Sequence, residues 1–276
     1  MRCLLALVIL LALAAPAHAA APAAPTFDRT PRQGALLVGT TTPGSRVLLG
    51  RDNLRTDDAG RFLLALDRDA PAHVALRIVG PDGTEGTFDL AVAPRAWKVE
   101  RVNGLQPKKV TPDPEHLKRI RAEGALIAQA RRRDSAAARV PAAFAWPVTG
   151  RISGVFGSQR VLNGQPRSPH RGLDIAAPPG TPVRPMAPGV VSLVHPDMFY
   201  TGRTVMVDHG FGLASVYVHM RDIAVTEGQK VDADTVIGTV GQSGRATGPH
   251  LHWGVSLFGT LVDPAGLVGP MPQEGQ

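Results

Sequence analysis

The stretch His250-Leu251-His252-Trp253 decides the fold of the C-terminal half of this 276-residue chain. Side chains at positions i and i+2 of a strand share one face, so His250 and His252 would point the same way while Leu251 and Trp253 enter a core. Polar or small residues alternate with apolar ones as far as Val255, which is typical of a half-buried strand. The stretch therefore predicts a β-sheet with two imidazoles on its polar face.

A second motif lies upstream, where residues 170–174 read HRGLD. His170 and Asp174 are four positions apart, so they share one face under either helical or strand periodicity. Pro169 and Gly172 disfavour a helix here, which leaves a strand as the prediction. Both motifs can then line one cleft. Imidazoles and a carboxylate are the ligands of catalytic zinc sites that keep one coordination position open.

A third histidine follows a strand pattern between the two motifs. Every second residue from Ala214 to Val218 is apolar, and the intervening positions carry Ser215, Tyr217 and His219. This alternation predicts a polar stripe that ends in His219, with Tyr217 on the same face as a candidate donor to an oxyanion. A lone histidine on a strand is more often structural than a ligand. Three histidines and an aspartate on strands of one domain favour a metal site.

Residues 146–264 resemble the lysostaphin-type metalloendopeptidases, which cut peptidoglycan cross-links. The resemblance runs in the family's order through residues 170–176, 180–183, 189–191, 207–210, 217–220, 228–231, 237–238, 244–245, 248–252 and 262–264. It implies an antiparallel β peptidase domain with a duplicated hybrid motif, which we place at residues 144–268. It also implies Zn²⁺ as the cofactor.

The resemblance implies roles for five residues. His170, Asp174 and His252 match the zinc ligands, and His219 and His250 match the histidines beside the metal that do not bind it. The chain has no H-E-x-x-H motif, so no glutamate is placed as a general base. We therefore assign His219 and His250 jointly as catalytic residues that deprotonate water and stabilise the tetrahedral intermediate. The division of these tasks between them stays open.

The N-terminal end predicts export. Residues 1–19 have a charged start, an apolar core and a small-x-small cleavage site, as a signal peptide does. Cleavage would leave a periplasmic or secreted chain without a transmembrane segment, and without cysteine because Cys3 is the only one. The net charge of +7 suits an anionic cell envelope. Export and the lack of a clustered basic-aromatic motif argue against nucleic acid as a partner.

The remaining residues predict two further segments in a mostly β protein. Residues 27–95 hold short apolar runs separated by turn signals, which indicates a small immunoglobulin-like β-sandwich. Residues 96–143 form a linker, with a helix expected at about 112–133 because Pro114 suits a first turn and an apolar stripe follows. Whether the N-terminal domain inhibits the peptidase or targets it stays open.

These features predict a zinc metalloendopeptidase that hydrolyses the peptide stems of peptidoglycan. The alternative is a non-catalytic regulator of other cell-wall hydrolases, but regulators that resemble this family lack metal ligands, and here all five key positions are filled. A lipoyl-type carrier, suggested by residues 225–240, fits neither export nor the aspartate. The bond that is cut is not decided, although the resemblance implies the D-Ala–diaminopimelate cross-link for a Gram-negative wall.

Overall fold

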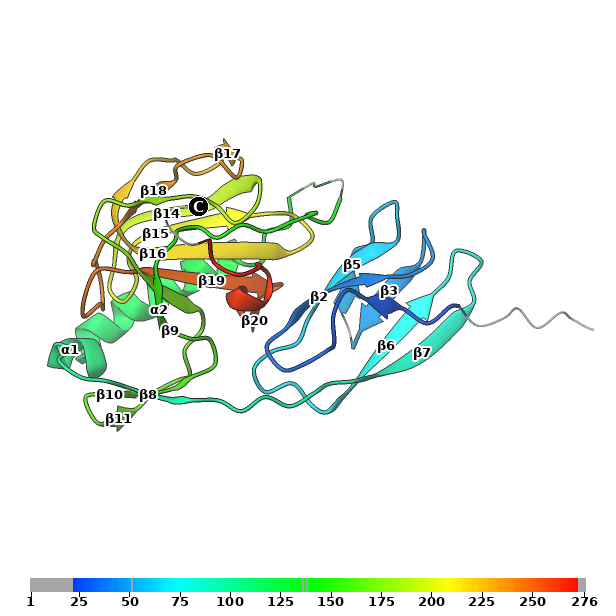
Figure 1. Cartoon of the computed structure of the whole chain (residues 1–276), viewed down its shortest axis with the longest axis horizontal. Coiled ribbons are helices and arrows are strands. Elements are labelled where there is room, and N and C mark those ends of the chain that lie inside the picture. The colour runs from blue at the N-terminus through cyan, green and yellow to red at the C-terminus, as the bar shows by residue number, and fades with distance from the viewer. Residues whose placement is uncertain (1–21, 51, 136, 138, 273–276) are drawn as a thin grey trace, which may run out of the picture.

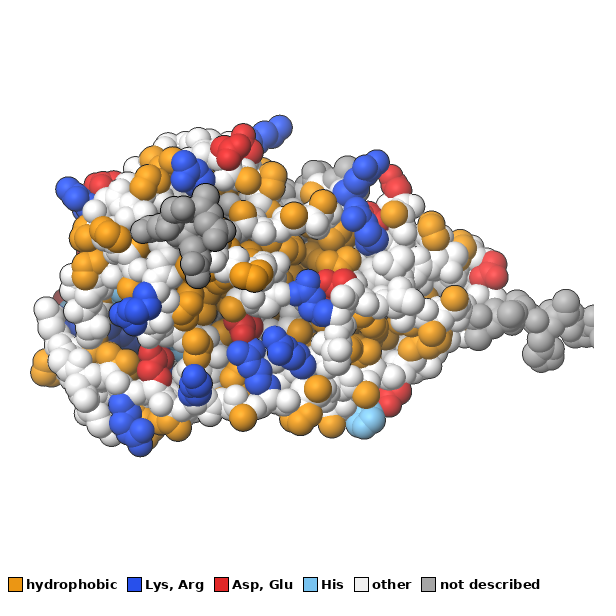
Figure 2. Space-filling view, viewed as in Figure 1, with side chains coloured by type: hydrophobic (Ala, Val, Ile, Leu, Met, Phe, Trp, Pro, Cys, Tyr) orange, Lys and Arg blue, Asp and Glu red, His pale blue; other side chains and the backbone are white. Residues whose placement is uncertain are grey.

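The computed structural model describes residues 22–272 except 51, 136 and 138, and these residues form a mostly antiparallel β protein with two lobes (Figure 1). The signal peptide predicted at residues 1–19 lies outside the described residues. Within the described part, no helix is both long and apolar enough to cross a bilayer. Figure 2 shows Lys and Arg side chains spread over the visible face of both lobes, so the positive charge forms no single patch there.

The N-terminal lobe consists of two small antiparallel sheets. One sheet has the order β1-β2-β5 and the other the order β4-β3-β6-β7. Their strands are β1 (Thr26–Phe27), β2 (Leu36–Thr40), β3 (Arg46–Leu49), β4 (Asp52–Leu54), β5 (Arg61–Ala65), β6 (His73–Val79) and β7 (Glu85–Ala91). Leu37 and Phe62 from the first sheet and Leu76 and Ile78 from the second are buried in one cluster. The sandwich-like packing follows from these facing apolar residues, while the immunoglobulin-like topology and the bounds 27–95 stay predictions.

The segment between the lobes contains more structure than the predicted helix. It holds strand β8 (Val99–Val102), helix α1 (Pro107–Val110) and helix α2 (Pro114–Ala130). The sequence analysis expected a helix at about 112–133, and α2 occupies most of this range; Asp113 accepts a hydrogen bond from the His116 N–H and caps its first turn. Strand β8 pairs in parallel with β10 (Gln159–Leu162), which also pairs with β11 (Gln165–Pro166). The linker is therefore attached along its length to the C-terminal lobe.

The C-terminal lobe is built on one ten-stranded sheet. Its main path runs β17-β14-β15-β16-β19-β12-β9, with β13, β18 and β20 attached to it. The strands are β9 (Arg151–Gly154), β12 (Leu173–Ala176), β13 (Pro182–Val183), β14 (Gly189–Met198), β15 (Gly202–Asp208), β16 (Leu213–Ile223), β17 (Lys230–Val231), β18 (Gly238–Val240), β19 (Leu251–Leu257) and β20 (Thr260–Val262), followed by a 3-10 turn (Pro264–Gly266).

The two faces of strands β16 and β19 have different neighbours. The register pairs Tyr217 with Trp253 and Val218 with His252, so these pairs alternate between the faces. Tyr217 and Trp253 are fully buried in the main core. On the other face, Val218 belongs to a smaller apolar cluster on which α2 packs through Ile127 and Ala130. The face that carries His252 is therefore partly covered by the linker helix.

The two lobes share a core. Leu36, Leu63 and Ala65 of the N-terminal lobe belong to the same buried cluster as Trp253 of the C-terminal sheet. The Arg95 side chain also forms an ion pair with Asp263 at 2.6 Å. Burial of apolar side chains at this contact stabilises the arrangement of the lobes.

Candidate metal centre

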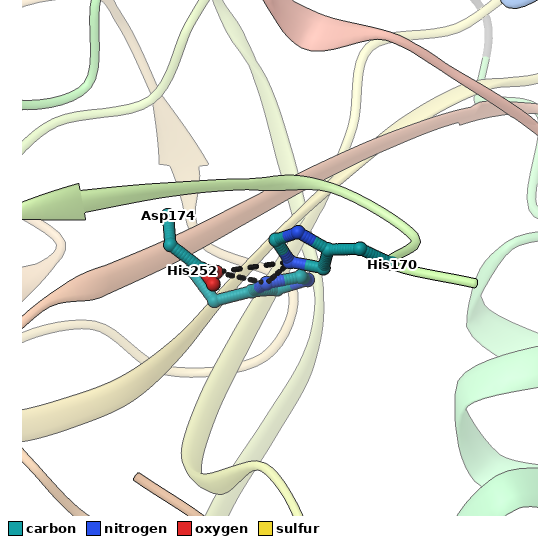
Figure 3. Close-up of side chains that lie close together, drawn as sticks. All are labelled: His170, Asp174 and His252. Atoms are coloured by element: carbon teal, nitrogen blue, oxygen red, sulfur yellow. Dashed lines mark hydrogen bonds and ion pairs between the residues drawn. The ribbon is translucent and has the colours of Figure 1, made fainter. Parts of the chain in front are cut away.

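Asp174 and His252 face each other across two neighbouring strands. The antiparallel register of β12 and β19 pairs these two residues directly, so both side chains leave the same face of the sheet. His170 lies four residues before Asp174, in the loop that leads into β12. Figure 3 shows the three side chains pointing toward one another from these elements. The structure thus brings together the three residues that the sequence predicts as metal ligands.

The three facing atoms form a tight triangle. Asp174 Oδ1 lies 2.7 Å from His252 Nδ1 and 3.0 Å from His170 Nε2, and the two nitrogens are 3.0 Å apart. The His170 Nδ1–H donates to the Val155 carbonyl at 3.1 Å, which leaves the lone pair of Nε2 directed at the triangle. Two imidazole nitrogens and one carboxylate oxygen at this spacing fit a cation such as Zn²⁺, which prefers these ligands.

Two glycines make room for this triangle. A Cβ atom at Gly172 would lie 2.5 Å from the Trp253 carbonyl oxygen and 2.7 Å from His252 Nε2. A Cβ atom at Gly154 would lie 2.5 Å from Asp174 Oδ2. All three distances are too short for a residue with a Cβ atom, so the glycine of the HRGLD motif has a steric role beside the two ligand candidates.

Charge on the Asp174 carboxylate is maintained by its neighbours. Burial alone would raise the pKa of Asp174, but the close approach of the His170 and His252 rings holds that pKa well below its ordinary value. Burial also lowers the pKa of His252 to about 4, against the opposing effect of Asp174. The site therefore presents an ionised carboxylate and a neutral imidazole at neutral pH, which are the protonation states that a metal cation needs.

Arg160 and Glu100 support the triangle from outside, and the sequence analysis missed both. Arg160 Nη2 donates to Asp174 Oδ2 at 2.8 Å, so the other oxygen of this carboxylate is the one turned to the histidines. Arg160 Nε in turn donates to Glu100 Oε2 at 3.3 Å. No local motif marks these two residues, because the contact depends on the parallel pairing of β8 with β10.

His219 and His250 lie beside the triangle. Their ring centroids are 4.7 Å apart, and the His219 centroid is 6.2 Å from that of His252. The His219 Nδ1–H donates to the Ser243 carbonyl at 2.7 Å, and the His250 Nδ1–H donates to the Gly248 carbonyl at 2.8 Å. Each ring therefore has its Nε2 atom left as the proton acceptor. Burial, followed by the charges of His250 and His252, lowers the pKa of His219 to about 3.

A β-bulge brings His219 to this face. The pairing of β15 with β16 shifts register between Arg203 and Val205, and His219 has a positive φ of 63°. A regular strand would instead place His219 on the face of Tyr217, as the sequence analysis expected. That expectation was wrong for Tyr217, which is fully buried on the core side and accepts a hydrogen bond from the Met186 N–H at 2.7 Å. Tyr217 is therefore not an oxyanion donor.

Comparison with known proteins gives matches in the same region. Residues 168–264 match the model of peptidase family M23. The DD-carboxypeptidase/endopeptidase Mpg of Neisseria meningitidis is 41% identical over 104 residues, which are 38% of this chain and 24% of that protein. The peptidoglycan DD-endopeptidase ShyA of Vibrio cholerae is 40% identical over 116 residues, which are 41% of this chain and 26% of that protein.

The matched region of these two curated relatives is about a quarter of their own length. A solved structure extends the similarity to both lobes. A Pseudomonas aeruginosa protein assigned to peptidase M23 superimposes with a TM-score of 0.68 and 32% sequence identity, over 87% of this chain and 96% of that one. Because this similarity covers nearly the whole of a protein of that family, and because the family model matches the residues around the His-Asp-His triangle, the chain belongs to peptidase family M23.

Proposed function

We propose that this chain is a zinc metalloendopeptidase that hydrolyses peptide cross-links of peptidoglycan. The observation that carries the proposal is the triangle of His170 Nε2, Asp174 Oδ1 and His252 Nδ1 with two further histidines beside it. The names of the relatives, a DD-carboxypeptidase/endopeptidase and a peptidoglycan DD-endopeptidase, support peptidoglycan stem peptides as the substrate class.

In this proposal the three residues of the triangle hold Zn²⁺ and are its only protein ligands. When bound, the metal supplies a Lewis acid and a water molecule that ionises near neutral pH. Arg160 keeps Asp174 Oδ2 occupied, so that Oδ1 is the ligand atom. Gly172 leaves space for the His252 ring to reach the same point. The chain thus fixes the ligand atoms before the substrate arrives.

His219 and His250 move the protons. The backbone carbonyls of Ser243 and Gly248 fix their tautomers, so each Nε2 atom can take a proton from the attacking water. The lowered pKa of His219 keeps that ring neutral at physiological pH. Once protonated, an Nε2–H can donate to the developing oxyanion or to the leaving amine. Either histidine can fill either role.

The same proposal covers location and organisation. A signal peptide at residues 1–19 would export the chain to the periplasm or the medium, where it would meet the peptide stems and the anionic envelope. The organisation is an N-terminal β domain at 27–95, a linker at 96–143 and the peptidase domain at 144–268. The cross-link expected for a Gram-negative wall joins D-Ala to diaminopimelate.

Intact sacculi incubated with the purified protein test the proposal. We expect cross-linked muropeptide dimers to be converted to monomers, and a chelator to stop the conversion until zinc is restored. Asp174→Asn is the matched control, since it keeps the shape of the side chain and removes its charge. A protein that holds zinc and releases nothing from any wall type would support the non-catalytic regulator instead.

A further inference from the structure

A cavity of about 470 Å³ opens beside the histidine cluster and has an unusual set of charges. His170, His219 and His252 line one side of it, and Val216 and Val218 line its apolar part. Within the described residues its lining contains no acidic side chain and five arginines, namely Arg131, Arg160, Arg167, Arg171 and Arg245. Such a cavity attracts anions.

These arginines differ in whether a carboxylate of the protein compensates their positive charge. Arg160 pairs with Asp174 and Glu100, so its charge is compensated inside the protein. Arg245 donates to the Lys109 carbonyl at 3.3 Å and lies over the Tyr200 ring, with 4.3 Å from its guanidinium carbon to the ring centroid. These partners are neutral and leave its charge uncompensated. The described part of the chain supplies no carboxylate partner to Arg131, Arg171 or Arg245.

Arg131 and Arg171 are close enough to repel each other. Burial, followed by the positive charge of Arg171, lowers the pKa of the Arg131 guanidinium to about 10. Arg131 is half-buried at the C-terminal end of α2, and Arg171 directly follows His170. Holding two uncompensated guanidinium groups together is unfavourable, and a bound anion between them would remove that cost.

We propose that this cavity binds a free carboxylate of the peptide substrate and that Arg131, Arg171 and Arg245 select it. The proposal rests on the proposed function and names the substrate group that the site recognises. A guanidinium group presents a planar pair of donors that matches a carboxylate, and Val216 and Val218 give the aliphatic part of a stem residue an apolar surface. Because His170, His219 and His252 line the same cavity, a carboxylate held there positions the neighbouring amide at the histidines.

A pair of substrates tests this selection. One is the D-Ala–diaminopimelate cross-linked dimer of stem peptides with free carboxyl groups, and the other is the same dimer with those groups converted to carboxamides. We expect amidation to lower kcat/KM of the full-length zinc protein by about 10- to 100-fold, as the loss of a charge-assisted hydrogen bond does. Arg171→Gln and Arg245→Gln should lower kcat/KM by a similar factor on the free substrate and by less than about threefold on the amidated one.

Arg121→Gln is the matched control, because Arg121 is exposed on α2, the helix that Arg131 caps, and does not line this cavity. Zinc content and circular dichroism of each variant show whether it folds.

Equal losses on both substrates, or no loss with folded variants, would overturn the carboxylate pocket while hydrolysis itself stood. If wild type hydrolyses neither dimer, calorimetric binding of the two dimers decides: tighter binding of the free form supports the pocket and only the proposed function fails. Equal binding overturns the pocket.

Discussion

The two sides of the candidate site are held in place by different means. The His-Asp-His triangle belongs to the sheet, where the register of β12 and β19 and hydrogen bonds of 2.7–3.1 Å fix each atom. The opposite side comes from the linker, through Glu100 on β8 and Arg131 at the end of α2, which attach by a four-residue parallel pairing and a small apolar cluster. In the proposed function, chemistry therefore depends on the sheet, whereas the linker contributes to recognition and support.

Removal of a triangle residue should give the largest effect. We expect His170→Ala, Asp174→Ala and His252→Ala to lose both bound zinc and hydrolysis, since each supplies one of three facing ligand atoms. Metal content by mass spectrometry and muropeptide release are the measurements. Retention of one zinc per chain in His252→Ala would contradict the ligand assignment and, with it, the division between the two sides.

The two neighbouring histidines should separate metal binding from turnover. In His219→Ala and His250→Ala we expect zinc content to stay at one per chain and kcat to fall by about 10²–10⁴, the usual contribution of general acid–base catalysis. Asn variants at the same positions are controls for the cavity left by alanine. Loss of zinc from either variant would show that the residue belongs to the metal-binding set instead.

The sequence predicted the sheet side far better than the linker side. Strand periodicity placed His250 and His252 on one face because this pattern depends only on neighbouring residues. His219 reached the cleft through a β-bulge with positive φ, which periodicity does not show, and Tyr217 was misplaced for the same reason. The contact between Arg160 and Glu100 had no local signal, since it depends on pairing between residues about 60 positions apart in the chain.

The contact between the two lobes was also not predictable from local sequence patterns. The apolar runs at residues 27–95 predicted β-strands, and the structure has strands in this region. These runs did not indicate that Leu36 and Leu63 would join the core of the C-terminal sheet. Contacts between distant segments depend on the complementary shapes of their side chains as well as on hydrophobicity. That complementarity is not visible in the pattern of a single sequence. The helix expected at about 112–133 and found at 114–130 was predictable, because a first-turn proline and an apolar stripe are local signals.

A buried histidine inside the C-terminal sheet should make the free energy of unfolding depend on pH. His209 is buried, with Nδ1 at 2.8 Å from the Pro188 carbonyl and Nε2 at 2.8 Å from Ser215 Oγ, and burial lowers its pKa to about 4. The unfolded chain has the ordinary value near 6.5, so it binds more protons between these two values. The free energy of unfolding should thus fall as pH drops from about 6.5 toward 4, by up to about 3 kcal/mol.

Urea unfolding at pH 7 and pH 5 measures this dependence. His209→Gln keeps a polar side chain at the position but does not titrate, so the difference between the two pH values should shrink in that variant. An unchanged difference would assign the pH dependence to other buried groups, such as His219 or His252. Chelator is included in every sample, because bound metal would shift the titration of the histidines that hold it.

The smallest effects should come from the supports of Asp174, and they test whether the linker acts through the sheet. Arg160→Gln removes the 2.8 Å hydrogen bond to Asp174 Oδ2 and should weaken zinc affinity by about 10- to 100-fold, as changes beside metal ligands do. Glu100→Gln removes only a longer, partly exposed contact at 3.3 Å, so its effect should be about two- to threefold.

Zinc affinity by competition with a chromophoric chelator measures both variants. The double variant Arg160→Gln/Glu100→Gln completes the comparison. Because Glu100 reaches the carboxylate only through Arg160, its substitution should have no further effect once Arg160 is gone. Full additivity of the two losses would show that β8 supports the triangle by a separate route, through the 4.0 Å approach of Glu100 to His170.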